Sequence, residues 1–176
     1  MTGLMATFGH EEQEESDYPY DYGHILLGSW FTCPEKGVAD SITAYFKLSW
    51  FRNYKFVIYR KSDGVKVAET VEGDGDGEYG WKTLVFDEPK PTLNAEDYWL
   101  MIITTDNVLY FKFIIETDKG CDAMVVTYPT APDPISPSLA STKHSIFCTY
   151  TPTPPSNPLV SKPLICPIIA AKPLIR

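Results

Sequence analysis

The sequence has few of the residues and motifs that mark enzymes or membrane spans. Its 176 residues include only three histidines, and it contains no G-x-S-x-G turn, no H-E-x-x-H pair and no glycine-rich phosphate loop. No run of eighteen apolar residues occurs, so we expect no transmembrane helix. We therefore expect a protein that is not an enzyme and has no membrane span.

Positive charge is also scarce and is unevenly distributed. Fifteen Lys and Arg residues oppose 23 Asp and Glu residues, and this net charge of −8 argues against a nucleic-acid partner, which needs a basic face. Residues 1–22 contain acids but no base, whereas residues 152–176 contain bases but no acid. We therefore divide the chain into an acidic N-terminal leader (1–22), a body (23–151) and a Pro-rich linker with an apolar C-terminal strand (152–176).

The body is rich in short runs of β-branched and aromatic residues, each bounded by Gly, Pro, Asn or Asp. No amphipathic helix of normal length interrupts these runs. Eight or nine strands at this spacing predict an all-β fold, an antiparallel two-sheet β-sandwich of the jelly-roll type. The runs are Ile25–Thr32, Ser41–Trp50, Lys55–Arg60, Val65–Thr70, Trp81–Phe86, Tyr98–Thr104, Val108–Ile115, Met124–Thr127 and Ser145–Tyr150.

The body contains several distinctive motifs, which are Gly80-Trp81-x-Thr83-x-x-Phe86, Pro89, Pro91, Leu93, Ala95, Tyr98-Trp99-Leu100, Ile58–Gly64 and Ser145–Tyr150. These motifs resemble those of β-sandwich domains in uncharacterised environmental and virion-surface proteins, and the overall pattern is similar to carbohydrate-binding jelly rolls. The resemblance covers about residues 23–150, and it implies the fold more directly than the function.

Four cysteines occur without any C-x-x-C spacing, so we expect no zinc site among them. Cys33 and Cys148 lie in strand-like runs at the start and the end of the body. Because first and last strands often neighbour each other in sandwiches, this pair is the favoured disulfide. The alternative is four buried free thiols that act as small hydrophobic residues.

An acidic, glycine-rich loop between two predicted strands is a candidate cation site. Asp74, Asp76 and Glu78 alternate with glycines and could surround Ca²⁺ with oxygen ligands. The alternative is a flexible hairpin loop without a ligand. We expect no other cofactor.

Glycan binding would need exposed aromatic rings flanked by polar groups. The candidates for such a platform are Tyr18, Tyr20, Tyr22, Trp50 and Phe51. Trp81 and Trp99 each lie within a strand run, which favours a place in the core.

The C-terminal segment is too apolar for a solvated linker, and its prolines exclude a helix. Pro163, Pro167 and Pro173 all occupy odd positions, so an extended strand would lack its amide donors along one edge and could pair along the other. The apolar anchors of this strand are Leu159, Leu164, Ile165, Ile168, Ile169, Leu174 and Ile175. The linker before it has three hydroxyl side chains that are candidates for O-glycosylation, on Thr151, Thr153 and Ser156.

Two functions are consistent with these features. In the first, the protein is a non-enzymatic structural subunit whose C-terminal strand adds to a neighbouring copy and builds an extracellular filament or surface array head to tail. The strand could instead dock on its own body. In the second, the protein is a carbohydrate-binding or adhesion module, or a virion-surface protein, with glycans as its partners. Both functions predict an extracellular or virion-surface location.

Overall fold

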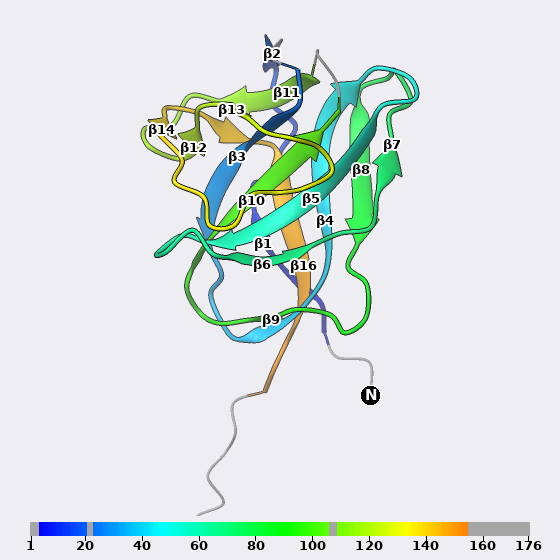
Figure 1. The fold of residues 1–176 in the computed structure, drawn as a ribbon. Helices are drawn as coiled ribbons and strands as arrows, with labels where there is room; N and C mark the ends of the chain where they lie inside the picture. The colour runs from blue at the N-terminus through cyan, green and yellow to red at the C-terminus, as the bar shows by residue number, and fades with distance from the viewer. Residues whose placement is uncertain (1–3, 21–22, 106–108, 155–176) are drawn as a thin grey trace, which may run out of the picture.

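A computed structural model describes residues 4–20, 23–105 and 109–154, which form two antiparallel β-sheets packed face to face (Figure 1). The predicted all-β, two-sheet sandwich is confirmed. The described residues contain no helix that is long and apolar enough to cross a membrane.

Sheet A is organised around one long strand, β4 (Gly37–Leu48). The order of its main path is β1 (Ala6–Gly9), β16 (Ile146–Pro152), β4, β11 (Leu109–Ile114) and β15 (Lys143–His144). Three further strands complete it, with β2 (Ser16–Tyr20) beside β11, and with β8 (Gly80–Val85) and β9 (Thr92–Leu93) beside β4.

Sheet B has a centre of three long strands, in which β10 (Asp97–Thr104) lies between β3 (Ile25–Thr32) and β5 (Asn53–Arg60). On the β3 side follow β12 (Gly120–Cys121), β14 (Leu139–Ala140) and β13 (Met124–Val125). On the β5 side follow β6 (Lys66–Glu69) and β7 (Gly73–Asp74).

The core forms where the period-two pattern of sheet A meets the apolar strands of sheet B. In β4, Ile42, Ala44, Phe46 and Leu48 are fully buried, whereas the residues between them point to the other face. The ring of Phe46 packs edge-on against Phe56 of sheet B, with 6.1 Å between ring centroids. One face of β4 is thus committed to the core and the other is left for the surface.

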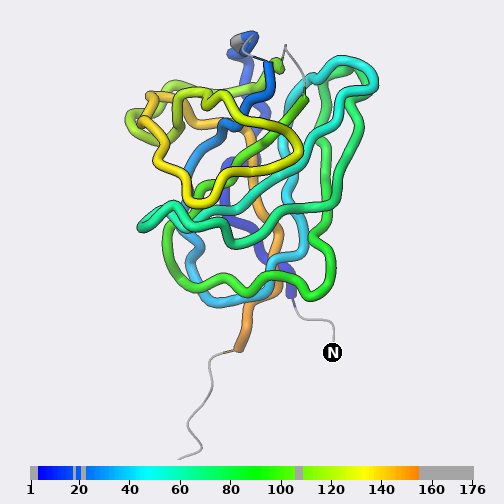
Figure 2. Tube along the Cα trace, viewed as in Figure 1, coloured from blue at the N-terminus to red at the C-terminus, as the bar shows by residue number. Residues whose placement is uncertain are grey.

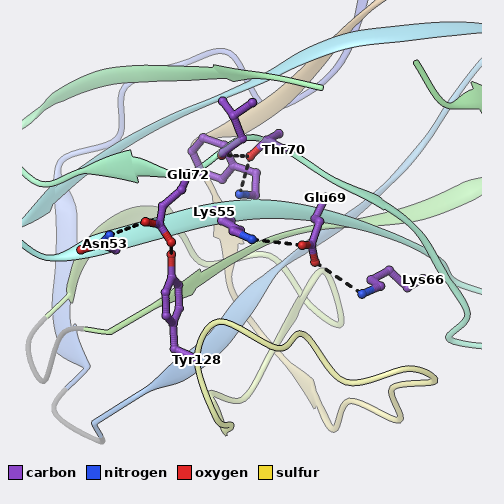
Figure 3. Close-up of polar contacts among 9 residues, drawn as sticks. Asn53, Lys55, Lys66, Glu69, Thr70, Glu72 and Tyr128 are labelled. Atoms are coloured by element: carbon purple, nitrogen blue, oxygen red, sulfur yellow. Dashed lines mark hydrogen bonds and ion pairs between the residues drawn. The ribbon is translucent and has the colours of Figure 1, made fainter. Parts of the chain in front are cut away.

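The outer face of sheet B is covered by the segment between β12 and β14, which crosses in front of β3, β10 and β5 (Figure 1). Ala131 and Ile135 of this segment are buried in the core cluster. The hydroxyl of Tyr128 donates a hydrogen bond to Glu72, which also accepts one from Asn53 (Figure 3). Sheet B is therefore covered on both faces.

The predicted acidic leader contributes two strands to sheet A. β1 pairs with β16 through Phe8, which is buried opposite Cys148, and β2 pairs with β11. The described chain therefore starts and ends at the same end of the sandwich (Figure 2). Composition concealed these strands, because the acids cluster between them, around residues 11–15, while the strands themselves are short.

The predicted disulfide between Cys33 and Cys148 is absent, and both are buried free thiols, as is Cys121. Cys33 follows β3 of sheet B, whereas Cys148 belongs to β16 of sheet A, so the neighbour of the last strand is β1 rather than β3. Burial raises the pKa of the Cys121 thiol to about 12. Cys166 lies outside the described residues.

Close contact between β3 and β10 depends on Gly28. A Cβ at this position would lie 2.0 Å from the carbonyl oxygen of Leu100, so the backbones would have to separate. We predict that Gly28→Ala lowers the free energy of unfolding by about 3 kcal/mol, measured by urea denaturation. Gly80→Ala is the matched control, because a Cβ there meets no atom within 4 Å. Equal stability of the two variants would contradict this packing.

Candidate functional site

Five aromatic side chains form a continuous row on the outer face of sheet A. Neighbouring ring centroids lie 6.3, 6.4, 5.3 and 5.6 Å apart along the row. In order, the row consists of Tyr110 in β11, Tyr79 just before β8, Tyr45 in β4, Trp81 in β8 and Phe147 in β16. We call these five residues the aromatic row.

The row results from strand register combined with alternation. Trp81 is the direct cross-strand partner of Tyr45, and Phe147 is paired with Thr43, two residues away on the same face of β4. Because directly paired residues in an antiparallel sheet point to the same face, outward residues of separate strands meet. Neighbours in the row therefore lie far apart in the sequence.

The rings form a stepped surface rather than a flat one. Tyr45 and Tyr79 are nearly parallel, at 12°, whereas Trp81 meets both Tyr45 and Phe147 edge-on, at 71° and 61°. Trp81 is 39% exposed and Tyr79 is 37% exposed. The row thus offers ring faces and ring edges to a bound molecule.

Polar groups line the row near Tyr79. The ammonium groups of Lys112 and Lys47 lie 4.9 and 5.7 Å from the centroid of the Tyr79 ring. The Tyr79 hydroxyl donates a hydrogen bond to Asp17, and Lys112 lies 3.2 Å from the same carboxylate oxygen. These two partners hold the pKa of Asp17 below its usual value, whereas desolvation and the bond to Asp17 raise the pKa of Tyr79. The tyrosine therefore stays a neutral hydroxyl.

Trp30 of sheet B also lies beside charged groups, and these groups contact its ring. The ammonium groups of Lys61 and Lys119 lie 3.3 and 3.5 Å from the centroid of the Trp30 ring. The indole N–H of Trp30 donates to the carbonyl oxygen of Asp118. These two ammonium groups lie closer to the Trp30 ring than Lys112 and Lys47 lie to the Tyr79 ring, so they leave less of it open to a ligand.

Ser29 and His144 are the described residues that most resemble a nucleophile and its base. The Ser29 Oγ lies 2.9 Å from His144 Nδ1, and the Tyr20 hydroxyl lies 3.3 Å from His144 Nε2. Both Ser29 and His144 are fully buried, so no substrate can reach them. Burial lowers the pKa of His144 to about 3, which keeps the imidazole neutral. The pair is a satisfied polar group within the sandwich.

The three acids of the predicted calcium loop do not converge. Both carboxylate oxygens of Asp76 lie 2.6 Å from Lys82 Nζ, and the amide of Glu78 donates to the same carboxylate. Asp74, Asp76 and Glu78 do not bring their ligand atoms within 4.8 Å of one another. A lysine ammonium thus occupies the position that a cation would take on Asp76.

The aromatic residues expected at the surface lie elsewhere than the row. Trp50 and Phe51 are 61% and 87% exposed at the turn after β4, and Tyr20 contacts His144. The side chains of Tyr18 and Tyr22 lie outside the described part of the chain. Trp99 is buried as expected, but Trp81, which was expected in the core, belongs to the row.

Sequence reasoning missed the other four members of the row. Their signal is local alternation, as in Thr43-Ala-Tyr45-Phe-Lys47, where every second residue points outward. The pattern identifies the outward residues of one strand but not which strands lie side by side.

The residues proposed for assembly lie outside the described part of the chain, as does Ser156. Thr151 is paired with Val38 at the end of β16, and the amide of Thr153 donates to the carbonyl oxygen of Lys36. The assembly strand and the glycosylation sites stay predictions.

Comparison of this sequence with protein-family models and with curated proteins finds no match.

The buried neutral His144 predicts a loss of stability in mild acid. Its folded-state pKa lies below the unfolded value of about 6.5, so its contribution is fully present above that pH and is lost as the pH falls towards 3. We predict a loss on the order of 2 kcal/mol between pH 7 and pH 5, measured by urea denaturation. The His144→Gln variant should have a lower free energy of unfolding at pH 7. Its free energy of unfolding should also change less between pH 7 and pH 5. Identical pH slopes for both proteins would contradict the assignment.

Proposed function

We propose that this protein is a non-enzymatic binding module that holds a carbohydrate chain against the aromatic row of sheet A. The row is the observation that carries the proposal, because it places five contiguous rings on one face of the sheet, with Tyr79 and Trp81 exposed and charged groups beside Tyr79. Sugars present apolar C–H faces together with hydroxyl groups, and such ligands suit aromatic rings flanked by a few fixed donors and acceptors.

The polar groups beside Tyr79 support this ligand class. Lys47 and Lys112 supply ammonium donors near its ring, and Asp17 supplies an acceptor. Binding that combines ring contact with hydrogen bonds to sugar hydroxyls needs groups of both kinds, close together.

The stepped arrangement of the rings favours a single flexible chain over a flat crystalline surface. A flat surface would contact coplanar rings, whereas Trp81 stands at 71° to Tyr45 and at 61° to Phe147. A free polysaccharide chain can turn its successive sugars to meet such rings. Glycans of this kind occur mainly outside cells, so an extracellular or virion-surface location belongs to this proposal.

Alanine substitutions in the row test the proposal. We predict that Trp81→Ala and Tyr110→Ala each weaken binding to soluble polysaccharides about tenfold or more, which corresponds to about 1.4 kcal/mol. Affinity electrophoresis against a panel of neutral and acidic polysaccharides would identify a ligand, and titration calorimetry would measure the change.

Trp50→Ala is the matched control, because Trp50 is a more exposed tryptophan that lies outside the row. Its affinity should equal that of the unchanged protein. An equal loss of affinity in Trp50→Ala and Trp81→Ala would contradict a site on the row. The absence of binding to every polysaccharide in the panel would contradict it too.

Self-assembly is a second proposal, and strand β8 favours it. Among the described strands β8 pairs only with β4, and at its end the carbonyl oxygen of Val85 accepts a bond from the amide of Val71. The rest of this edge of sheet A, along Gly80–Leu84, could accept an added strand. The preceding segment is held in place up to Thr153, whose amide bonds to Lys36. The C-terminal strand of one copy would thus start from a fixed point and add to the edge of another.

Removal of the C-terminal strand tests the assembly. We predict that deletion of residues 159–176 leaves a folded monomer, and that the full-length variant Ile168→Asp with Ile169→Asp behaves in the same way. Light scattering and electron microscopy of the unchanged protein should show oligomers or filaments. Filaments that persist in both variants would contradict a role for this strand, as would a full-length protein that stays monomeric at high concentration.

A further inference from the structure

The connection between β1 and β2 brings three metal-ligating side chains together. One ligand atom each from His10, Glu12 and Glu14 lies within 4.8 Å of the other two. His10 Nε2 and a carboxylate oxygen of Glu14 are 2.6 Å apart. A single ion could contact all three residues after small side-chain rotations.

The backbone of this connection is fixed against sheet A at both ends. The amide of His10 donates to the carbonyl oxygen of Ile146 at 2.8 Å, and the amide of Glu14 donates to the hydroxyl of the fully buried Ser145 at 3.4 Å. Gly9 makes the first contact possible, since a Cβ there would lie 2.4 Å from Phe147 Cα. The backbones of His10 and Glu14, on either side of Glu12, are thus held in place before any ion binds.

Two of the three ligands are also largely shielded from water. The side chains of His10 and Glu14 are 11% and 18% exposed, whereas Glu12 is exposed. Shielded ligands lose less hydration when an ion binds, and an exposed third ligand leaves a route for its entry. Two ligands are thus shielded beside sheet A, and the third reaches them from the solvent side.

We propose that His10, Glu12 and Glu14 bind a divalent transition metal ion of the Zn²⁺ class, with water completing the coordination. One imidazole nitrogen and two carboxylate oxygens suit zinc and its neighbours, whereas Ca²⁺ and Mg²⁺ prefer oxygen ligands alone. The ion would take the place of the direct contact between His10 and Glu14, and its two positive charges would balance the two carboxylates. This site is separate from the aromatic row and does not depend on the proposed function.

The bound ion would link the two ends of the connection between β1 and β2 and so stabilise both strands. β1 and β2 are four and five residues long, and each pairs along its whole length with a different strand, β1 with β16 and β2 with β11. An ion that joins both ends of their connection restricts the separation of either strand. Metal binding should therefore raise the thermal stability of the folded chain.

Zinc titration of the full-length chain tests this site. Competition with a chromophoric chelator measures the affinity for Zn²⁺ alone, and thermal unfolding measures the stabilisation. We expect one Zn²⁺ per chain that His10→Ala and Glu12→Gln each weaken about tenfold or more. Glu12→Gln keeps the fold intact because its side chain is exposed, and it should also abolish the zinc-dependent rise in melting temperature.

Two matched controls separate the site from general attraction to acidic or histidine-bearing surfaces. Glu15→Gln, in the same acidic segment, and His24→Ala, at a histidine that is exposed, should leave the zinc affinity unchanged. Ca²⁺ at the same concentration should not compete. The assignment is overturned if Ca²⁺ competes equally, if both controls weaken binding as much as His10→Ala, or if Zn²⁺ binds equally well to His10→Ala and Glu12→Gln.

Discussion

Pairing along both edges of β4 is the constraint on which sheet A depends. β16 and β11 occupy one edge of this twelve-residue strand, and β8 and β9 occupy the other. Because the pairing fixes which face each residue presents, Phe46 reaches the core while Tyr45 reaches the surface. The same register carries Trp81 and Phe147 to the outer face, so the core and the aromatic row have one origin.

The outer faces of the two sheets carry different features. The segment between β12 and β14 lies over sheet B and is tied down by the bond between Tyr128 and Glu72. The partly exposed Trp30 of sheet B is held by two lysines. On sheet A, the five rings of the aromatic row contact one another, and Lys47, Lys112 and Asp17 lie beside Tyr79.

Local patterns in the sequence predict the strands and the two-sheet sandwich, because alternation and turn residues act over short distances. The pairing of strands is not local, which is why Cys33 and Cys148 were wrongly paired and Trp81 was expected in the core. The same limit conceals the row, since a tryptophan in a strand run could face either way. The cluster at His10 was missed for a different reason, because its acids look like part of a solvated leader.

The central claim is that ligands bind on the aromatic row, and tryptophan NMR tests it most directly. The four indole N–H groups of Trp30, Trp50, Trp81 and Trp99 report on four separate places in the sandwich. During titration with a polysaccharide that binds, we predict that the Trp81 signal shifts and saturates while the other three stay in place. A saturating shift at Trp50 or Trp30 with Trp81 unchanged would contradict the account.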